Sequence, residues 1–190
     1  WGMPGEIVEH GLDTALFSPL GYPREQRCLS VVNDWVNRDY CCGFNIWREV
    51  IQGFPFFVLG DTAGLSKPAT SIQHLISEYN KSLIFVNTST ISPVPTVLLE
   101  AMSCGCAVVS TATCMIPEII TDGVNGFLSN DISVLRNRIE LLLGNPELAT
   151  KLGHEARKTV LERFNIERFT RDWNKIFTES VAFKNDFISN

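Results

Sequence analysis

The residues best suited to chemistry lie between Ser92 and Asn130, at and after the start of a predicted helix. Glu100 stands about one turn into that helix, where a carboxylate can accept two hydrogen bonds from a ribose diol. The backbone N–H groups of Thr96 and Val97 are unpaired at the helix start, where the dipole also favours a phosphate. Ser92 offers a hydroxyl that can hydrogen-bond a sugar. The alternative for Glu100 is an ordinary surface or capping glutamate in a first turn.

The elements around these residues form one strand–helix–strand unit. The apolar run 83–86 predicts a buried parallel strand, and a polar turn follows it. Pro95 suits the first helical position because its missing N–H is one that a helix start leaves unpaired. The helix then covers residues 96–103, with Gly105 placed to end it before a second strand at 107–109. In open α/β sheets, ligands bind where such strand ends meet helix starts.

The rest of the chain continues this alternation and predicts an α/β fold, a Rossmann-like parallel sheet flanked by helices. Residues 6–13 have strand-then-turn character. Further strands are predicted at 29–32, 54–60 and 125–128, and helices at 43–52, from Thr70 or Ser71 to 79, at 117–121, and three times from 132 to the end. The last helix carries Phe169, Trp173, Ile176 and Phe177 on one face, for which packing in the core is the first expectation.

Composition limits the classes of function. A chain of 190 residues with 45% hydrophobic and 19% charged residues is typical of one ordinary globular domain. The net charge of −5 argues against a nucleic-acid-binding protein. No apolar run approaches the roughly 18–20 residues that span a bilayer, and no signal peptide is visible. None of the six cysteines stands at zinc spacing from a histidine. We therefore expect reduced thiols, a cytoplasmic protein, no metal and no cofactor.

Three segments resemble the nucleotide-sugar-binding motif of family 4 glycosyltransferases, which are retaining enzymes of the GT-B fold. They are Glu100-Ala-Met-Ser-Cys-Gly-Cys-Ala-Val-Val109, Pro117-Glu-Ile-Ile120 and Asp122-Gly-Val-Asn-Gly126, in the order that the family has them. The likeness is weaker elsewhere but covers most of the chain. It implies a domain that binds a nucleotide-diphosphate sugar for transfer to an acceptor, which can be a glycan, a lipid or a small molecule.

The resemblance also assigns roles within the motif. The family's matching glutamate binds the donor ribose, which implies that role for Glu100. Eight positions earlier the family has another glutamate, which contacts the transferred sugar; here Ser92 stands in its place. A hydroxyl cannot stabilise developing positive charge as a carboxylate does. Pro95 replaces a family glycine and removes one backbone donor, leaving the amides of Thr96 and Val97 for a phosphate.

Two loops complete the site that the resemblance implies. In the family, the loop after the first strand carries an arginine and a lysine that hold the donor diphosphate. The matching places here are Asn33 or Asp34 and Asp39 or Tyr40, and Arg38 is the one nearby cation. A solvated surface side chain is the equal alternative for Arg38. In the resembled enzymes, the base of the donor nucleotide lies near a loop like the one that begins here at Gly60 and Asp61. Gly60 and Asp61 are therefore further candidates for binding the donor nucleotide.

The likeness extends to domain organisation. Glu6-Ile-Val-Glu-His-Gly-Leu-Asp13, followed by Phe17-Ser-Pro19, resembles the segment that enters the C-terminal domain of GT-B enzymes. Residues 1–190 would then form a single donor-binding domain, with residues 1–20 as the interdomain linker and 165–190 as a helix that crosses between domains. The N-terminal acceptor domain would be absent, and the isolated chain is predicted to have little or no transferase activity.

Two other hypotheses remain beside the donor-binding domain. The first is a non-catalytic nucleotide- or sugar-binding module of the GT-B fold, in which the missing glutamate and the missing Arg/Lys pair reflect lost chemistry. The second is a GT-B-type sugar-nucleotide epimerase, which needs acid and base carboxylates that the sequence does not offer. Donor hydrolysis or transfer, measured after the missing domain is supplied, separates the first hypothesis from the enzyme.

Overall fold

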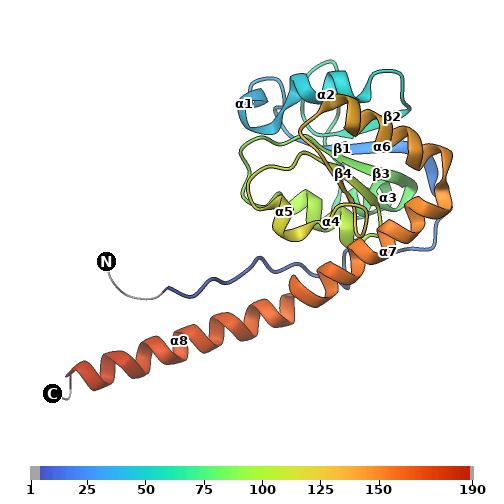
Figure 1. Cartoon of the computed structure of the whole chain (residues 1–190). Coiled ribbons are helices and arrows are strands. Elements are labelled where there is room, and N and C mark those ends of the chain that lie inside the picture. Colours follow the sequence, from blue (N-terminus) through green and yellow to red (C-terminus); the bar gives the residue numbers. More distant parts are fainter. Residues whose placement is uncertain (1–4, 189–190) are drawn as a thin grey trace.

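The fold is a five-stranded parallel sheet with helices on both faces, as the sequence predicts (Figure 1). The computed structural model describes the backbone of residues 5–188 and the side chains of residues 5–181. The strands are β1 Glu25–Val31, β2 Phe56–Leu59, β3 Ser82–Asn87, β4 Ala107–Ser110 and β5 Phe127–Leu128, in the spatial order β2-β1-β3-β4-β5. The helices are α1 Asp39–Cys42, α2 Phe44–Ile51, α3 Ile72–Lys81, α4 Thr96–Ser103, α5 Ile116–Ile119, α6 Ile132–Gly144, α7 Pro146–Arg163 and α8 Ile166–Ile188.

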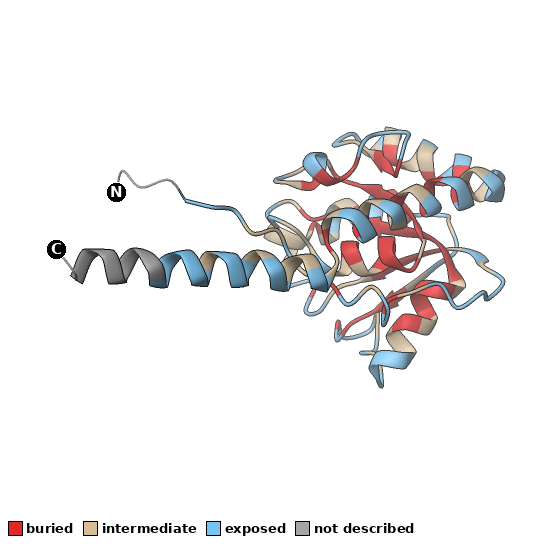
Figure 2. Ribbon diagram, turned by 90° about the horizontal axis from the view of Figure 1, so that it is seen from below, coloured by how far each residue is buried: buried red, intermediate tan, exposed pale blue. Residues whose placement is uncertain are grey.

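The central strand β3 separates two hydrophobic clusters. All six of its residues are buried, which is expected of a parallel strand covered on both faces (Figure 2). Phe85 packs with α3 and α4, whereas Ile84 and Val86 pack with α2 and α6. Helix α7 contributes to both clusters, through Ala149 and Leu152 on one side and Ala156 and Val160 on the other. Full burial of a Val, Leu, Ile or Phe side chain in these clusters stabilises the fold by about 1.5–3 kcal/mol.

Helix α4 begins and ends at the residues that the sequence predicts. The one correction is Pro95, which is the N-cap and not the first helical residue, because its ψ of 119° is still extended. At the other end Gly105 adopts φ 79°, a left-handed conformation that favours glycine and stops the helix. Both limits of α4 are therefore marked by residues whose backbone departs from the helical conformation.

The N-terminal segment 6–13 is not a strand, contrary to the prediction. Leu12 makes a single bridge with Asn165, and its N–H donates to the Phe164 carbonyl at 2.7 Å. The Arg168 guanidinium donates to the carbonyls of Glu9 and His10 at 2.8 and 2.7 Å. Because the backbone of this segment forms hydrogen bonds with residues at the junction of α7 and α8, the segment does not add a strand to the sheet.

Helix α8 extends away from the α/β body, and the N-terminal segment runs beside it (Figures 1 and 2). The expectation that its aromatic face packs in the core is wrong for two of its residues. Trp173 is 38% exposed and Phe177 is 59% exposed, and their rings stack with centroids 5.3 Å apart. Within the described residues α8 thus presents an aromatic surface to solvent.

The segment 121–129 is a hydrogen-bonded turn before a strand of only two residues, shorter than the predicted 125–128. Asn125 is 5% exposed, and its Oδ1 accepts from the Thr121 N–H at 2.7 Å. Its Nδ2 donates to the Ile119 carbonyl at 3.0 Å and to Thr159 Oγ1 at 2.9 Å. Asn125 therefore links the end of α5 to α7 by hydrogen bonds and has a structural role.

Replacing Asn125 with alanine is expected to lower the free energy of unfolding by about 1–2 kcal/mol. The change removes three hydrogen bonds and leaves buried partners unsatisfied. Urea unfolding followed by circular dichroism measures the loss. The control is Asn137→Ala on the exposed face of α6. A loss at Asn125 no larger than that at Asn137 would contradict a structural role.

Candidate functional site

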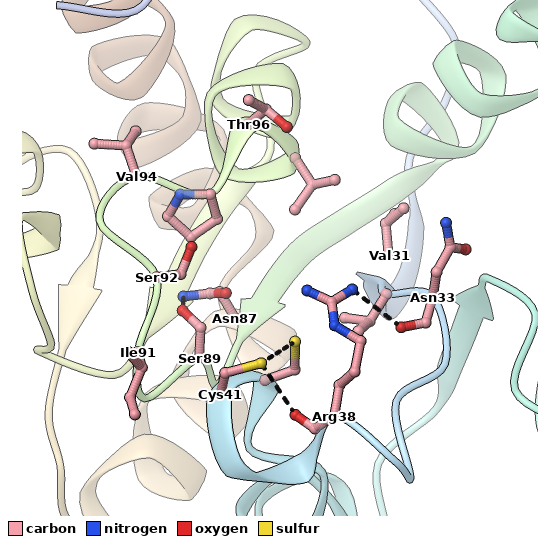
Figure 3. A pocket seen from close by; sticks show the side chains of 14 residues that line it. Val31, Asn33, Arg38, Cys41, Asn87, Ser89, Ile91, Ser92, Val94 and Thr96 are labelled. Carbon is pink, nitrogen blue, oxygen red and sulfur yellow. Dashed lines mark hydrogen bonds between the residues drawn. The ribbon is translucent and has the colours of Figure 1, made fainter.

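A cavity of about 370 Å³ lies at the point where the strand order reverses, between β1 and β3. For this strand order, ligands bind in the crevice beyond the carboxyl ends of those two strands. The walls come from the end of β1 and the loop to α1, and from the end of β3 and its turn into α4. The lining residues are Val31, Val32, Asn33, Arg38, Cys41, Cys42, Asn87, Ser89, Ile91, Ser92 and Val94 to Val97 (Figure 3).

Four of the residues predicted for the site meet at this cavity. Ser92, Thr96 and Val97 line it from the turn before α4 and from the helix start, and Arg38 lines it from the opposite loop (Figure 3). The Arg38 guanidinium donates to the Asn33 carbonyl at 3.4 Å. Among the lining residues Arg38 carries the one formal charge, so the cavity has a positive wall.

The start of α4 adds two backbone donors to that wall. The Leu98 N–H donates to the Pro95 carbonyl at 3.0 Å, whereas the N–H groups of Thr96 and Val97 have no protein acceptor within the described chain. Pro95 has no side chain that could cap them. The unpaired N–H groups and the helix dipole favour an anion here, by about 0.3–1 kcal/mol per charge at exposed sites.

The floor of the cavity contains polar residues that the sequence analysis missed. Asn87 Nδ2 donates to Ser89 Oγ at 3.0 Å and to Ser110 Oγ at 2.8 Å. Asn87 is the last residue of β3 and Ser89 lies two residues after it, and polar residues at the carboxyl end of such a strand are the signal that could have found them. The sulfurs of Cys41 and Cys42 lie 3.5 Å apart on the wall that faces them.

Glu100 lies one turn farther along α4 than Thr96 and does not line the cavity. It is half-buried, and its Oε2 accepts a hydrogen bond from the Tyr79 hydroxyl at 2.8 Å. Burial raises the pKa of the Glu100 carboxyl, and the hydrogen bond from Tyr79 opposes that rise. A carboxylate held in this way has one oxygen engaged by protein and one, Oε1, with no partner in the described residues.

Gly60 and Asp61 also lie outside the cavity, at the carboxyl end of β2. Asp61 Oδ1 accepts from the Asp34 N–H at 2.5 Å. A Cβ on Gly60 would stand 1.8 Å from the Val32 carbonyl oxygen, so only glycine permits this approach of the two backbones. In the structure, both residues hold the loop that carries Arg38.

Residues 68–159 match a protein-family model described as "Glycosyl transferases group 1". The match contains α4 and all three motif segments. This segment, just under half of the chain, carries the sequence of a group 1 glycosyltransferase domain.

Known proteins resemble this chain in sequence or in fold. The N-acetyl-alpha-D-glucosaminyl L-malate synthase of Bacillus anthracis is 35% identical over 83 residues, which are 43% of this chain and 22% of that relative. Sucrose-phosphate synthase from Thermosynechococcus elongatus superimposes with a TM-score of 0.79 at 18% identity, over 93% of this chain and 53% of that one. The chain thus spans about a fifth of the length of the curated relative and about half of the structural one.

Two further structures share the fold of this chain. The C-terminal domain of the glycosyl transferase group 1 family protein LpcC from Francisella tularensis gives a TM-score of 0.69 at 19% identity, over 82% of this chain and all of that one. Anabaena Alr3699/HepE in complex with UDP and glucose gives 0.75 at 17% identity, over 91% of this chain and 56% of that one. At these identities the likeness establishes the GT-B-type fold.

Neither a metal site nor a membrane-spanning helix is found in the described part of the chain. Among the side chains of residues 5–181, no group of three or more His, Cys, Asp or Glu could hold a metal ion. The described residues, 5–188, include no helix that is long and apolar enough to cross a bilayer.

Proposed function

We propose that the chain is the C-terminal, donor-binding domain of a retaining glycosyltransferase of family 4, and that it binds a nucleotide-diphosphate sugar. The observation that carries the proposal is the cavity between β1 and β3, which is bounded by the start of α4 and by Arg38. Two structural neighbours support it. The LpcC structure is that of a C-terminal domain, and Alr3699/HepE was solved with UDP and glucose.

The donor diphosphate lies against the N–H groups of Thr96 and Val97 and against the Arg38 guanidinium. These groups supply two backbone donors and one cation on facing walls of a single cavity. They neutralise phosphate charge without a metal ion or a cofactor. Ser92 lies on the same wall as the helix start and hydrogen-bonds the transferred sugar.

The nucleoside extends from the diphosphate along α4. Glu100 is one turn beyond Thr96 and holds the ribose diol through its carboxylate. The base lies toward the loop that begins at Gly60 and Asp61, which stands next to the β1 loop through the bond between Asp61 and Asp34. This arrangement uses three loops at the carboxyl edge of the sheet, as ligand sites in open α/β sheets do.

An N-terminal domain completes the enzyme and brings the acceptor. Residues 1–20 are the linker and α8 the crossover helix, whose exposed Trp173 and Phe177 pack on that domain. The chain alone then lacks transferase activity. All six cysteines are free, which supports a cytoplasmic location. Nucleic acid is not a partner because the net charge is −5.

Calorimetric titration of the chain with UDP, GDP and ADP tests the donor-binding function. We expect binding of one nucleotide in the micromolar to low-millimolar range, and Glu100→Ala is expected to weaken it at least about fivefold because it removes charge-assisted hydrogen bonds. The control is Glu140→Ala, a change at an exposed carboxylate on α6. Equal affinities of the Glu100 variant and the wild type would contradict the ribose assignment, and no binding of any nucleotide would contradict the site.

A non-catalytic binding module is the second candidate, and one observation favours it. No carboxylate is among the residues that line the cavity, so nothing there stabilises positive charge on a reacting sugar. Joining the chain to the acceptor domain of a group 1 relative separates the two candidates. Sugar release or transfer from the bound donor supports the enzyme, and donor binding without turnover supports the module.

A further inference from the structure

The hydroxyl of Tyr79 has one partner within the described chain, the carboxylate of Glu100. The two side chains come from different elements, because Tyr79 lies in the last turns of α3 and Glu100 in the middle of α4. The hydroxyl donates to Oε2 at 2.8 Å, and the tyrosine has no solvent exposure at all. A fully buried phenol that points its hydroxyl at a half-buried carboxylate fixes the position of that carboxylate.

The rest of the Tyr79 side chain has a separate, structural role. Its ring packs against Phe17 and Phe85 with centroids 6.4 and 6.0 Å away, in the cluster that α3 and α4 share. Phenylalanine at this position keeps that packing and removes only the hydroxyl. The effect of the hydrogen bond can therefore be measured apart from the effect of the ring.

We propose that Tyr79 is a positioning residue for nucleoside recognition: its hydroxyl holds Oε2 of Glu100 so that Oε1 faces the ribose diol. The inference rests on the proposed donor-binding function. It assigns to a buried residue of α3, distant in sequence from the motif, a share in discriminating ribonucleotides from nucleotides that lack the diol. Without the hydrogen bond from Tyr79, the Glu100 carboxylate would become ordered only when the ligand binds, and this ordering would weaken binding.

The surroundings of the carboxylate predict a pH dependence as well. The titratable groups near it are Tyr79 on α3 and Cys104 after α4, with Cys106 beside Tyr79. Burial raises the pKa of both thiols, so they stay neutral near pH 7. The pKa of Glu100 is already raised by burial, and loss of the opposing Tyr79 hydrogen bond raises it further. A protonated carboxyl accepts fewer hydrogen bonds, so affinity falls as the pH decreases through that pKa.

The experiment compares Tyr79→Phe with wild type by calorimetry, using UDP and 2′,3′-dideoxy-UDP, or the same pair for whichever base binds. We expect the variant to bind the ribonucleotide about fivefold to tenfold more weakly, and to bind the dideoxynucleotide as the wild type does. As the pH is lowered, the affinity of Tyr79→Phe for the ribonucleotide should begin to fall at a higher pH than that of the wild type. The control is Tyr22→Phe, a tyrosine that is 48% exposed.

The possible failures point to different conclusions. If the wild type binds no nucleotide, the proposed function fails and this inference fails with it. If the wild type prefers the ribonucleotide and Tyr79→Phe leaves that preference and its pH profile unchanged, only the positioning role is overturned. Equal weakening for both ligands, with an unchanged pH profile, means that the hydroxyl acts through the fold and also overturns the proposal.

Discussion

Replacing Gly153 with alanine is expected to lower the free energy of unfolding by about 3 kcal/mol or more, although alanine normally favours a helix by about 1 kcal/mol. Gly153 lies in the middle of α7. A Cβ there would stand 2.1 Å from the Gly105 carbonyl oxygen and 2.9 Å from its carbonyl carbon. Both obstacles are backbone atoms of the turn that ends α4, so no flexible side chain can move aside.

Urea unfolding measures this loss, and Gly144→Ala is the matched control. Gly144 is also a helical glycine, the last residue of α6, but nothing lies within 4 Å of the position that its Cβ would take. The control is expected to unfold at the same or a higher urea concentration than the wild type. An alanine at position 153 that behaves like the one at position 144 would show that α7 does not approach α4 this closely.

The sequence predicted the central strand–helix–strand unit well because strong local signals mark its limits. The apolar run of β3 is buried on both faces, and Gly105 ends α4 through a conformation that glycine favours. Segment 6–13 has similar strand propensity, yet it bonds to the junction of α7 and α8. That partner is about 150 residues away in sequence, and no local pattern reveals it.

For the candidate site, the sequence indicated groups near the cavity but not how they are held. Thr96, Val97 and Ser92 follow from the motif and from the start of a helix. Tyr79 could not be found, because a tyrosine on the apolar face of a helix looks like any core residue. Its partner Glu100 was named, but the contact between them depends on how α3 packs against α4.

Replacing Arg24 with methionine is the second change for which we expect a large effect, a loss of about 3 kcal/mol or more in the free energy of unfolding. The guanidinium is half-buried and donates to three carbonyls, those of Cys104 at 2.6 Å, Ser82 at 2.7 Å and Tyr79 at 3.1 Å. Methionine fills similar space but donates no hydrogen bond. These three carbonyls would then lose a charged donor at once.

Thermal and urea unfolding of Arg24→Met, Arg24→Lys and Arg171→Met test this expectation. Lysine keeps the charge but cannot reproduce the planar fork that reaches three carbonyls, so its loss should fall between those of the other two. Arg171 is 71% exposed, and its removal should cost less than about 0.5 kcal/mol. Equal stabilities of the methionine variants at positions 24 and 171 would contradict the role of Arg24.

Replacing Arg24 should also affect the candidate site. The carbonyls that Arg24 binds belong to α3 and α4, the two helices that carry Tyr79 and Glu100. Tyr79 is one of the three partners, and Cys104 is the C-cap of α4. A folded Arg24→Lys variant should therefore lose part of the preference for a ribonucleotide over its dideoxy form, as Tyr79→Phe does. If that preference survives in full, the hydrogen bond between Tyr79 and Glu100 does not depend on how Arg24 joins the two helices.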